Sequence, residues 1–395
     1  MDADPELFSP TGAPPPWYPL GLTDRAFDLE TLADGVPSPW GRFHGWDPSD
    51  VMSPEWWGAR AKEAWGEWPS SVHRVELVAH HRWGFEVQLD ERWTAHIYPL
   101  FTGHDVSTLA LHEPWRASLE NTDLLMPTAG LKRPLGDAVT VFPLHEMRSP
   151  WEHEGAPAHR AAMCGRLHSA LVGHATPNSE RRWNARLKAI EDRLKTSTLW
   201  RAPHTSAVVG LPTVRPGFGV VDEAPCLVPQ PRPLVEHLLC SPERRPGVAV
   251  AASLEQSIAI HDGFEGEVDR LAFYDAWASE VPPAWSSATA FSSANGGVWI
   301  WRYEAMLLLL AEGRAFSLND QAKRCEAWLR DVSRIQARLG ELRTVIAVRK
   351  ASMYGAIGIT VLVANSAGAW ALAAGAACVS VLAHLTYHRR LPEPI

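Results

Sequence analysis

Residues 351–387 read ASMYGAIGITVLVANSAGAWALAAGAACVSVLAHLTY, a run of 37 residues that contains no Asp, Glu, Lys or Arg. As one helix the run would be about 55 Å long, whereas the hydrocarbon core of a bilayer is about 30 Å thick. Near its middle, Asn365-Ser366-Ala367-Gly368 has the composition of a turn. The run therefore predicts a transmembrane helical hairpin with limbs at about 352–365 and 368–386.

Basic residues flank this run on both sides. Arg349-Lys350 precede it and His388-Arg389-Arg390 follow it, so the positive-inside rule places both ends of the hairpin, and the soluble part, in the cytoplasm. Many Gly, Ala and Ser residues would let the two helices pack closely. The alternative is a buried hairpin in a soluble core, because the Ala and Gly content makes the run only moderately hydrophobic.

An apolar seam precedes the run. Its members recur at spacings of three and four residues, as the a and d positions of a coiled coil do. They are Cys325, Trp328, Val332, Ile335, Leu339, Leu342 and Ile346. Residues 325–346 therefore predict either a coiled coil through which the chain forms a homo-oligomer, or an amphipathic helix packed on its own domain.

The overall composition limits the possible partners and domains. The 395 residues carry 37 Lys and Arg against 45 Asp and Glu, a net charge of −8, which argues against a nucleic-acid partner. Residues 1–70 are rich in Pro and Trp and predict an extended arm with a short helix at about 54–66. The remaining divisions are a main domain at 71–315, a helical stalk or coiled coil at 316–350, the hairpin at 351–387 and a cytoplasmic tail at 388–395.

Alternating apolar and polar residues open the main domain. Residues 72–101 predict strands, with Asp90-Glu91 as a turn. The pattern then predicts a helix at about 106–120, a strand at 138–144 and helices at about 155–174 and 178–195. The Pro-rich stretch 200–245 fits no core element.

This order of elements resembles the small lobe and hinge of the aminoglycoside-phosphotransferase-like kinases. The resemblance rests on the strand WTAHIYP, the helix LALHEPWRASL with Glu113, the Met126-Pro127 turn, the hinge strand 139–143, and a helix containing RLHSAL. It spans about 72–290 and implies an α+β, two-lobed kinase-like domain. Its catalytic half would be 248–280, read as strand, loop, strand, turn and strand.

The residues that the resemblance assigns to nucleotide binding are degenerate. His96 stands where the family has a Lys or Arg that pairs with the helix glutamate, here Glu113. Ala252 replaces the catalytic Asp, and Ser257 the metal-binding Asn; only Asp275 matches a magnesium ligand. Trp83-Gly84-Phe85 is too poor in glycine for a phosphate loop. The resemblance thus implies a pseudokinase without catalytic residues, whose cleft would hold ATP and magnesium if it still binds nucleotide.

Histidines do not form a recognisable metal motif in the sequence. His80-His81 is a doublet in a predicted strand, so its two side chains point to opposite faces and do not readily share a metal. Histidines beside acidic residues, such as His104 and His153, are more often solvated surface groups.

Together these observations predict a membrane-anchored, non-catalytic kinase-like scaffold or binding protein. Two alternatives stay open. One is an active small-molecule phosphotransferase that uses Asp275 for magnesium. The other is a membrane effector unrelated to kinases, whose hairpin oligomerises and perturbs the bilayer.

Overall fold

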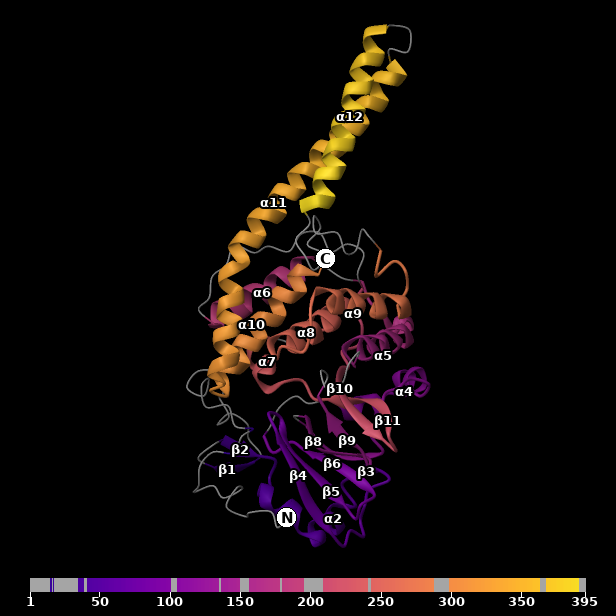
Figure 1. The fold of residues 1–395 in the computed structure, drawn as a ribbon. Coiled ribbons are helices and arrows are strands. Elements are labelled where there is room, and N and C mark those ends of the chain that lie inside the picture. Colours follow the sequence, from indigo (N-terminus) through magenta and orange to yellow (C-terminus); the bar gives the residue numbers. More distant parts are fainter. Residues whose placement is uncertain are drawn as a thin grey trace.

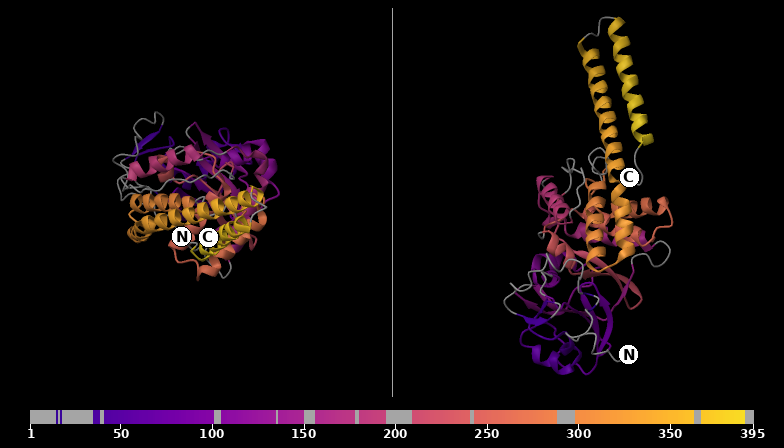
Figure 2. Two further views of the ribbon diagram at one scale, coloured as in Figure 1. Left: turned by 90° about the horizontal axis from the view of Figure 1, so that it is seen from above. Right: turned by 90° about the vertical axis from the view of Figure 1, so that its left-hand side faces the viewer.

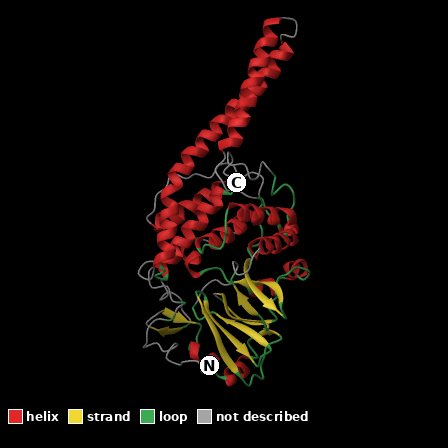
Figure 3. Ribbon diagram, viewed as in Figure 1, coloured by secondary structure: helices red, strands yellow, loops and turns green. Residues whose placement is uncertain are grey.

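Three parts follow one another along the molecule: a lobe built around a sheet, a lobe of helices, and a projecting pair of helices (Figures 1 and 3). The mixture of helix and sheet confirms the predicted α+β class. The computed structural model describes residues 15, 17, 35–38, 41–100, 105–134, 136–149, 156–177, 180–194, 209–240, 243–287, 298–362 and 367–390.

The first lobe contains a six-stranded antiparallel sheet in the order β3-β7-β8-β6-β5-β4. Its strands are β3 (Trp65–Gly66), β4 (Val75–His81), β5 (Gly84–Leu89), β6 (Trp93–Ile97), β7 (Ala129–Arg133) and β8 (Gly136–Pro143). The predicted turn between β5 and β6 is present, with Asp90 and Glu91 at φ 48° and 53°. The predicted helix after β6 is split into α3 (Ser107–Leu111) and α4 (Glu113–Leu119).

The two faces of this sheet have different partners. Phe85, Val87 and Ile97 point to one face and pack in a core with Trp56 and Trp57. These tryptophans come from α2 (Pro54–Arg60), which follows η4 (Pro48–Met52) and is shorter than predicted. Two short strands, β1 (Val36–Ser38) and β2 (Gly41–Phe43), lie upstream in the predicted arm.

The opposite face of the sheet turns toward the helical lobe. Phe142, which lies opposite Thr94 in the register, belongs to the core of that lobe. Because side chains alternate along a strand, Thr94, Glu86 and His96 share this face. All three are buried, so this face is a polar layer between the sheet and the helices.

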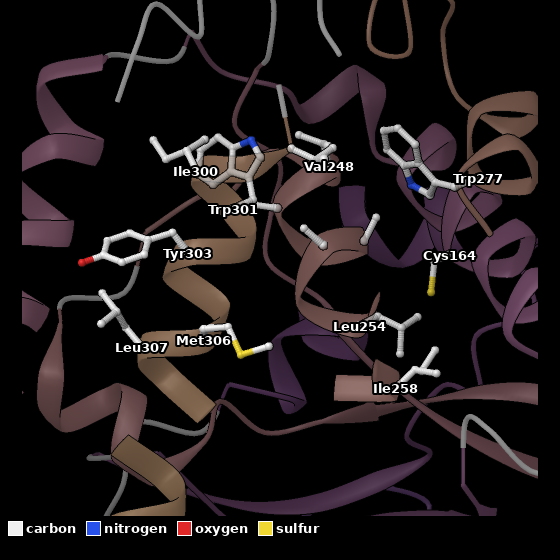
Figure 4. Close-up of a cluster of buried hydrophobic side chains, with 14 of the residues drawn as sticks. Cys164, Val248, Leu254, Ile258, Trp277, Ile300, Trp301, Tyr303, Met306 and Leu307 are labelled. Atoms are coloured by element: carbon white, nitrogen blue, oxygen red, sulfur yellow. The ribbon is translucent and has the colours of Figure 1, made fainter. Parts of the chain in front are cut away.

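The helical lobe contains one three-stranded sheet, in the order β11-β10-β9, and six α-helices among the described residues. The strands are β9 (Glu146–Arg148), β10 (Arg215–Val221) and β11 (Ala224–Gln230). The helices are α5 (Ala156–Ala170), α6 (Glu180–Leu194), α7 (Leu234–Leu239), α8 (Gly247–Ile260), α9 (Glu267–Glu280) and α10 (Trp299–Ala315), with the 3-10 turn η5 (Val172–His174) after α5. Leu254 and Ile258 of α8 and Trp301 and Met306 of α10 lie in its core (Figure 4).

Two predictions for this lobe are wrong. Residues 248–260 and 267–280 are helical, in α8 and α9, because the apolar residues of α8 recur at helical spacing and are buried on several sides. The Pro-rich stretch 200–245 contains the β10–β11 hairpin and α7. Two of the three prolines in this ladder, Pro216 and Pro229, lie opposite each other, so their missing N–H donors fall at one position of the register.

The chain ends in two long helices, α11 (Asn319–Leu362) and α12 (Ala367–Arg390), which pack side by side and project from the body (Figures 1 and 2). Ser380 donates a hydrogen bond to the Arg349 carbonyl oxygen across this pair. Nearer the body, Cys325 and Val332 of the predicted seam are buried in the core of the helical lobe. The seam thus packs on its own domain, and self-association through 325–346 stays a prediction.

One described helix is long and apolar enough to cross a membrane. Its apolar segment is Trp370–Tyr387 in α12, with a mean hydropathy of 1.4 and most side chains exposed. The two predicted limbs lie in α11 and α12, but only one described helix meets this criterion, so the predicted transmembrane hairpin is not shown.

Candidate functional site

A cleft with a volume of about 680 Å³ lies between the sheet and the helical lobe. The hairpin that joins β4 to β5 contributes His81 and Trp83, and β10 contributes Phe218. The floor comes from α8, with Leu254 and Ser257. A volume of this size matches the clefts that hold small-molecule ligands.

Sequence dictates the tight turn that carries Trp83. Gly84 has φ 152°, and a Cβ atom there would lie 1.9 Å from the Ile97 carbonyl oxygen. Only glycine allows β5 to approach β6 so closely at this point. The turn therefore presents Trp83 at the cleft.

The walls of the cleft are apolar and aromatic, and its charged groups are mostly basic. Arg82 forms an ion pair of 2.7 Å with Glu312, and Arg148 forms one of 2.7 Å with the exposed Glu146. Among the described residues that line the cleft, Glu312 is the single carboxylate. Burial and the nearby guanidinium groups of Arg82 and Arg324 lower the pKa of His261, which keeps its imidazole neutral at pH 7.

A buried ion-pair network fixes the elements beside the cleft. Glu236 of α7 accepts hydrogen bonds from Arg186 and Arg215, and Glu304 of α10 pairs with Arg186 and Arg245. Burial opposes the charge on Glu304, but the two guanidinium groups outweigh it and lower its pKa to about 2. A small cavity of about 90 Å³ adjoins these residues. Since each arginine has a carboxylate partner, we assign the network a structural role.

The structure does not bring the four predicted site residues together. Ser257 lines the cleft, whereas His96 is buried within β6. Glu113 is exposed at the start of α4, where it pairs with Arg116 at 2.7 Å and not with His96. Asp275 is exposed on α9 and does not line the cleft. The strands and loop that the resemblance predicts between Ser257 and Asp275 are replaced by α8 and α9, and only Ser257 of the two lines the cleft.

Sequence reasoning missed most of the residues that line the cleft. Phe218 lies in the Pro-rich stretch that fits no predicted core element, and the sequence around Trp83 has too little glycine for a phosphate loop. The signal for Trp83 was its place directly before Gly84, in a turn between two strands that alternate in polarity.

Comparisons with known proteins do not identify the chain. No protein family and no curated protein matches the sequence. Among solved structures, crystal form A of a glucosamine kinase has a TM-score of 0.41 and 13% sequence identity, over 71% of this chain and 80% of that chain. A glucosamine kinase in complex with glucosamine, ADP and inorganic phosphate has a TM-score of 0.41 and 11% identity, over 70% and 82%. A likeness at this level does not assign a function.

Proposed function

We propose that the protein is a membrane-anchored, non-catalytic binding protein whose cleft holds a planar, anionic ligand of the nucleotide type. The observation that carries this proposal is the composition of the cleft. The cleft has a volume of about 680 Å³ and is lined by aromatic side chains and two arginines. Glu312, its one carboxylate among the described residues, is already paired with Arg82.

Aromatic side chains favour a planar ligand. Trp83 and Phe218 enter the cleft from the sheet lobe and the helical lobe. Aromatic faces bind nucleobases by stacking, largely without regard to the identity of the base. Arg148 supplies a guanidinium group that suits phosphate oxygens, since its present partner Glu146 is exposed and such a surface pair contributes little to stability.

The same composition argues against phosphoryl transfer. That reaction uses carboxylate or amide ligands for magnesium and a group that orients the acceptor hydroxyl. Glu312 is neutralised by Arg82, and Asp275, the residue expected to hold magnesium, is exposed on α9. We infer that arginine rather than magnesium neutralises the phosphates of the ligand.

The exposed apolar side chains of the terminal helices support the membrane anchor. Trp370, Leu372 and Leu382 of α12 are each more than half exposed, as are Tyr354 and Ile357 of α11. Soluble proteins rarely expose apolar groups in such numbers on one element. A bilayer would cover these side chains.

Ligand binding can be tested by calorimetric titration of the detergent-solubilised full-length protein with ATP. We expect binding by the wild type and at least a tenfold loss in Ser257→Trp, because the indole ring would fill the cleft above α8. Ser279→Trp is the matched control, since Ser279 is exposed on α9. Equal affinity in the two variants would place the ligand elsewhere, and no binding by the wild type would refute the nucleotide assignment.

A further inference from the structure

Glu86, His96 and His145 form a cluster of buried polar side chains on the sheet face that turns toward the helical lobe. Glu86 of β5 lies directly opposite His96 of β6 in the strand register. His145 follows the end of β8. One side-chain nitrogen or oxygen atom from each of the three lies within 4.8 Å of the other two.

Three of the four ring nitrogens of the two histidines in this cluster lack a hydrogen-bond partner. His96 is completely buried, and neither of its ring nitrogens has a hydrogen bond. The Nε2 atom of His145 is also buried without one. An unsatisfied buried polar group costs about 1–3 kcal/mol, so an apolar residue would be more stable at position 96 unless something binds there.

Neighbouring groups fix the orientation of His145. Its Nδ1 atom lies 3.1 Å from the Pro143 carbonyl oxygen, to which it must donate a proton. Its backbone N–H donates to Thr94 Oγ1 at 3.2 Å. The Nε2 atom is then the nitrogen with a free lone pair, and metal-binding histidines are held in the same way by a backbone carbonyl.

We propose that Glu86, His96 and His145 bind one first-row transition-metal ion of the zinc class. Imidazole nitrogens select such ions over magnesium or calcium, and two histidines with one glutamate form a known three-ligand zinc set. Ligand atoms around tetrahedral zinc lie roughly 3.4 Å apart, so atoms within 4.8 Å reach the ion by small side-chain rotations.

His81 has a supporting role in this site. Its Nε2 atom lies 3.0 Å from Glu86 Oε2, and its ring stacks on Trp83 with centroids 4.5 Å apart. A hydrogen bond of this kind orients a carboxylate ligand toward the metal. The ion would thus join β5, β6 and the segment after β8 directly behind the turn that carries Trp83.

The site can be tested on tag-free full-length protein in detergent, loaded with zinc, washed and analysed for bound metal. We expect one zinc ion per chain in the wild type, none in His96→Ala and His145→Ala, and one in the control His73→Ala, whose side chain is exposed. Loss of the supporting bond in His81→Ala should weaken zinc affinity about 10–100-fold. No retained zinc in the wild type, or equal zinc in all variants, would overturn the proposal.

A second variant separates metal binding from folding. Glu86→Gln keeps the shape of the side chain and a hydrogen bond with His81 but is a poor metal ligand, so it should fold and yet lose zinc. Zinc should raise the melting temperature of the wild type but not that of Glu86→Gln. A rise of the same size in both would show that zinc binds elsewhere. Neither readout involves ATP, so the outcome is independent of the proposed nucleotide binding.

Discussion

Asp137 shows how burial of one side chain controls stability. It is fully buried at the start of β8, and its Oδ2 atom accepts a hydrogen bond of 2.9 Å from the Ser107 backbone N–H. Burial outweighs this bond and raises the pKa of Asp137 to about 6. Between the ordinary carboxyl pKa and about pH 6, Asp137 is therefore protonated in the folded state and ionised in the unfolded state. The free energy of unfolding falls as the pH rises through this range.

Asp137→Asn should remove this pH dependence, because an amide keeps the acceptor for Ser107 and does not ionise. Between about pH 5 and about pH 8, the free energy of unfolding of the wild type should fall by roughly 1–1.5 kcal/mol more than that of the variant. Urea unfolding at the two pH values measures the difference. An identical pH dependence in both proteins would show that Asp137 does not titrate as stated.

At the residue scale, the sequence could indicate His96 but not its role. The resemblance selected it as a replacement for a basic residue that pairs with Glu113, yet Glu113 is exposed on α4. Its actual neighbours, Glu86 and His145, are brought near by the strand register and by the end of β8. No short spacing in the sequence encodes such a contact, so the cluster required the structure.

At the scale of elements, a buried charge joins three helices. Glu255 of α8 accepts hydrogen bonds of 2.8 Å from two nitrogens of Arg302 in α10 and one of 2.7 Å from the Tyr274 hydroxyl in α9. Burial would raise the pKa of Glu255, but Arg302 outweighs it and the pKa lies below its usual value.

Glu255→Ala should lower the free energy of unfolding by about 3–5 kcal/mol, because Arg302 would remain buried without its main partner. The double variant Glu255→Leu/Arg302→Leu should recover much of this loss, since neither charge then remains. Urea unfolding of Glu255→Ala, of the single variants Glu255→Leu and Arg302→Leu, and of the double variant tests the pair. A double variant as unstable as the sum of its single variants would show that the two charges do not interact.

The spacing of apolar residues along the sequence predicts most of the strands and helices whose contacts are local. The strands within 72–101 and the helices near 155–174 and 178–195 are present because alternation or helical spacing defines them. The predictions are wrong in two places. In α8 and α9 the kinase resemblance predicts strands, and in the β10–β11 hairpin the prolines argue against a strand ladder. In the β10–β11 hairpin, pairing between the two strands and not local propensity decides the structure.

At the scale of the whole molecule, the apolar segment of the projecting helices predicts a membrane location. We expect the full-length chain to sediment with membranes and to resist carbonate extraction, because α12 carries the apolar segment Trp370–Tyr387. Truncation after Arg349 removes this segment and should leave a protein that stays in the supernatant. A full-length chain that is soluble without detergent would contradict the membrane anchor.

Binding without phosphoryl transfer is tested most directly by one paired measurement: the affinity of the full-length protein for ATP with magnesium and with EDTA, followed by phosphate release in the same samples. We predict equal affinity in both conditions and phosphate release at background level, since Arg82 neutralises the one carboxylate of the described cleft. Magnesium-dependent binding, together with phosphate release that Ser257→Trp abolishes and Ser279→Trp does not, would contradict this account and show an active phosphotransferase.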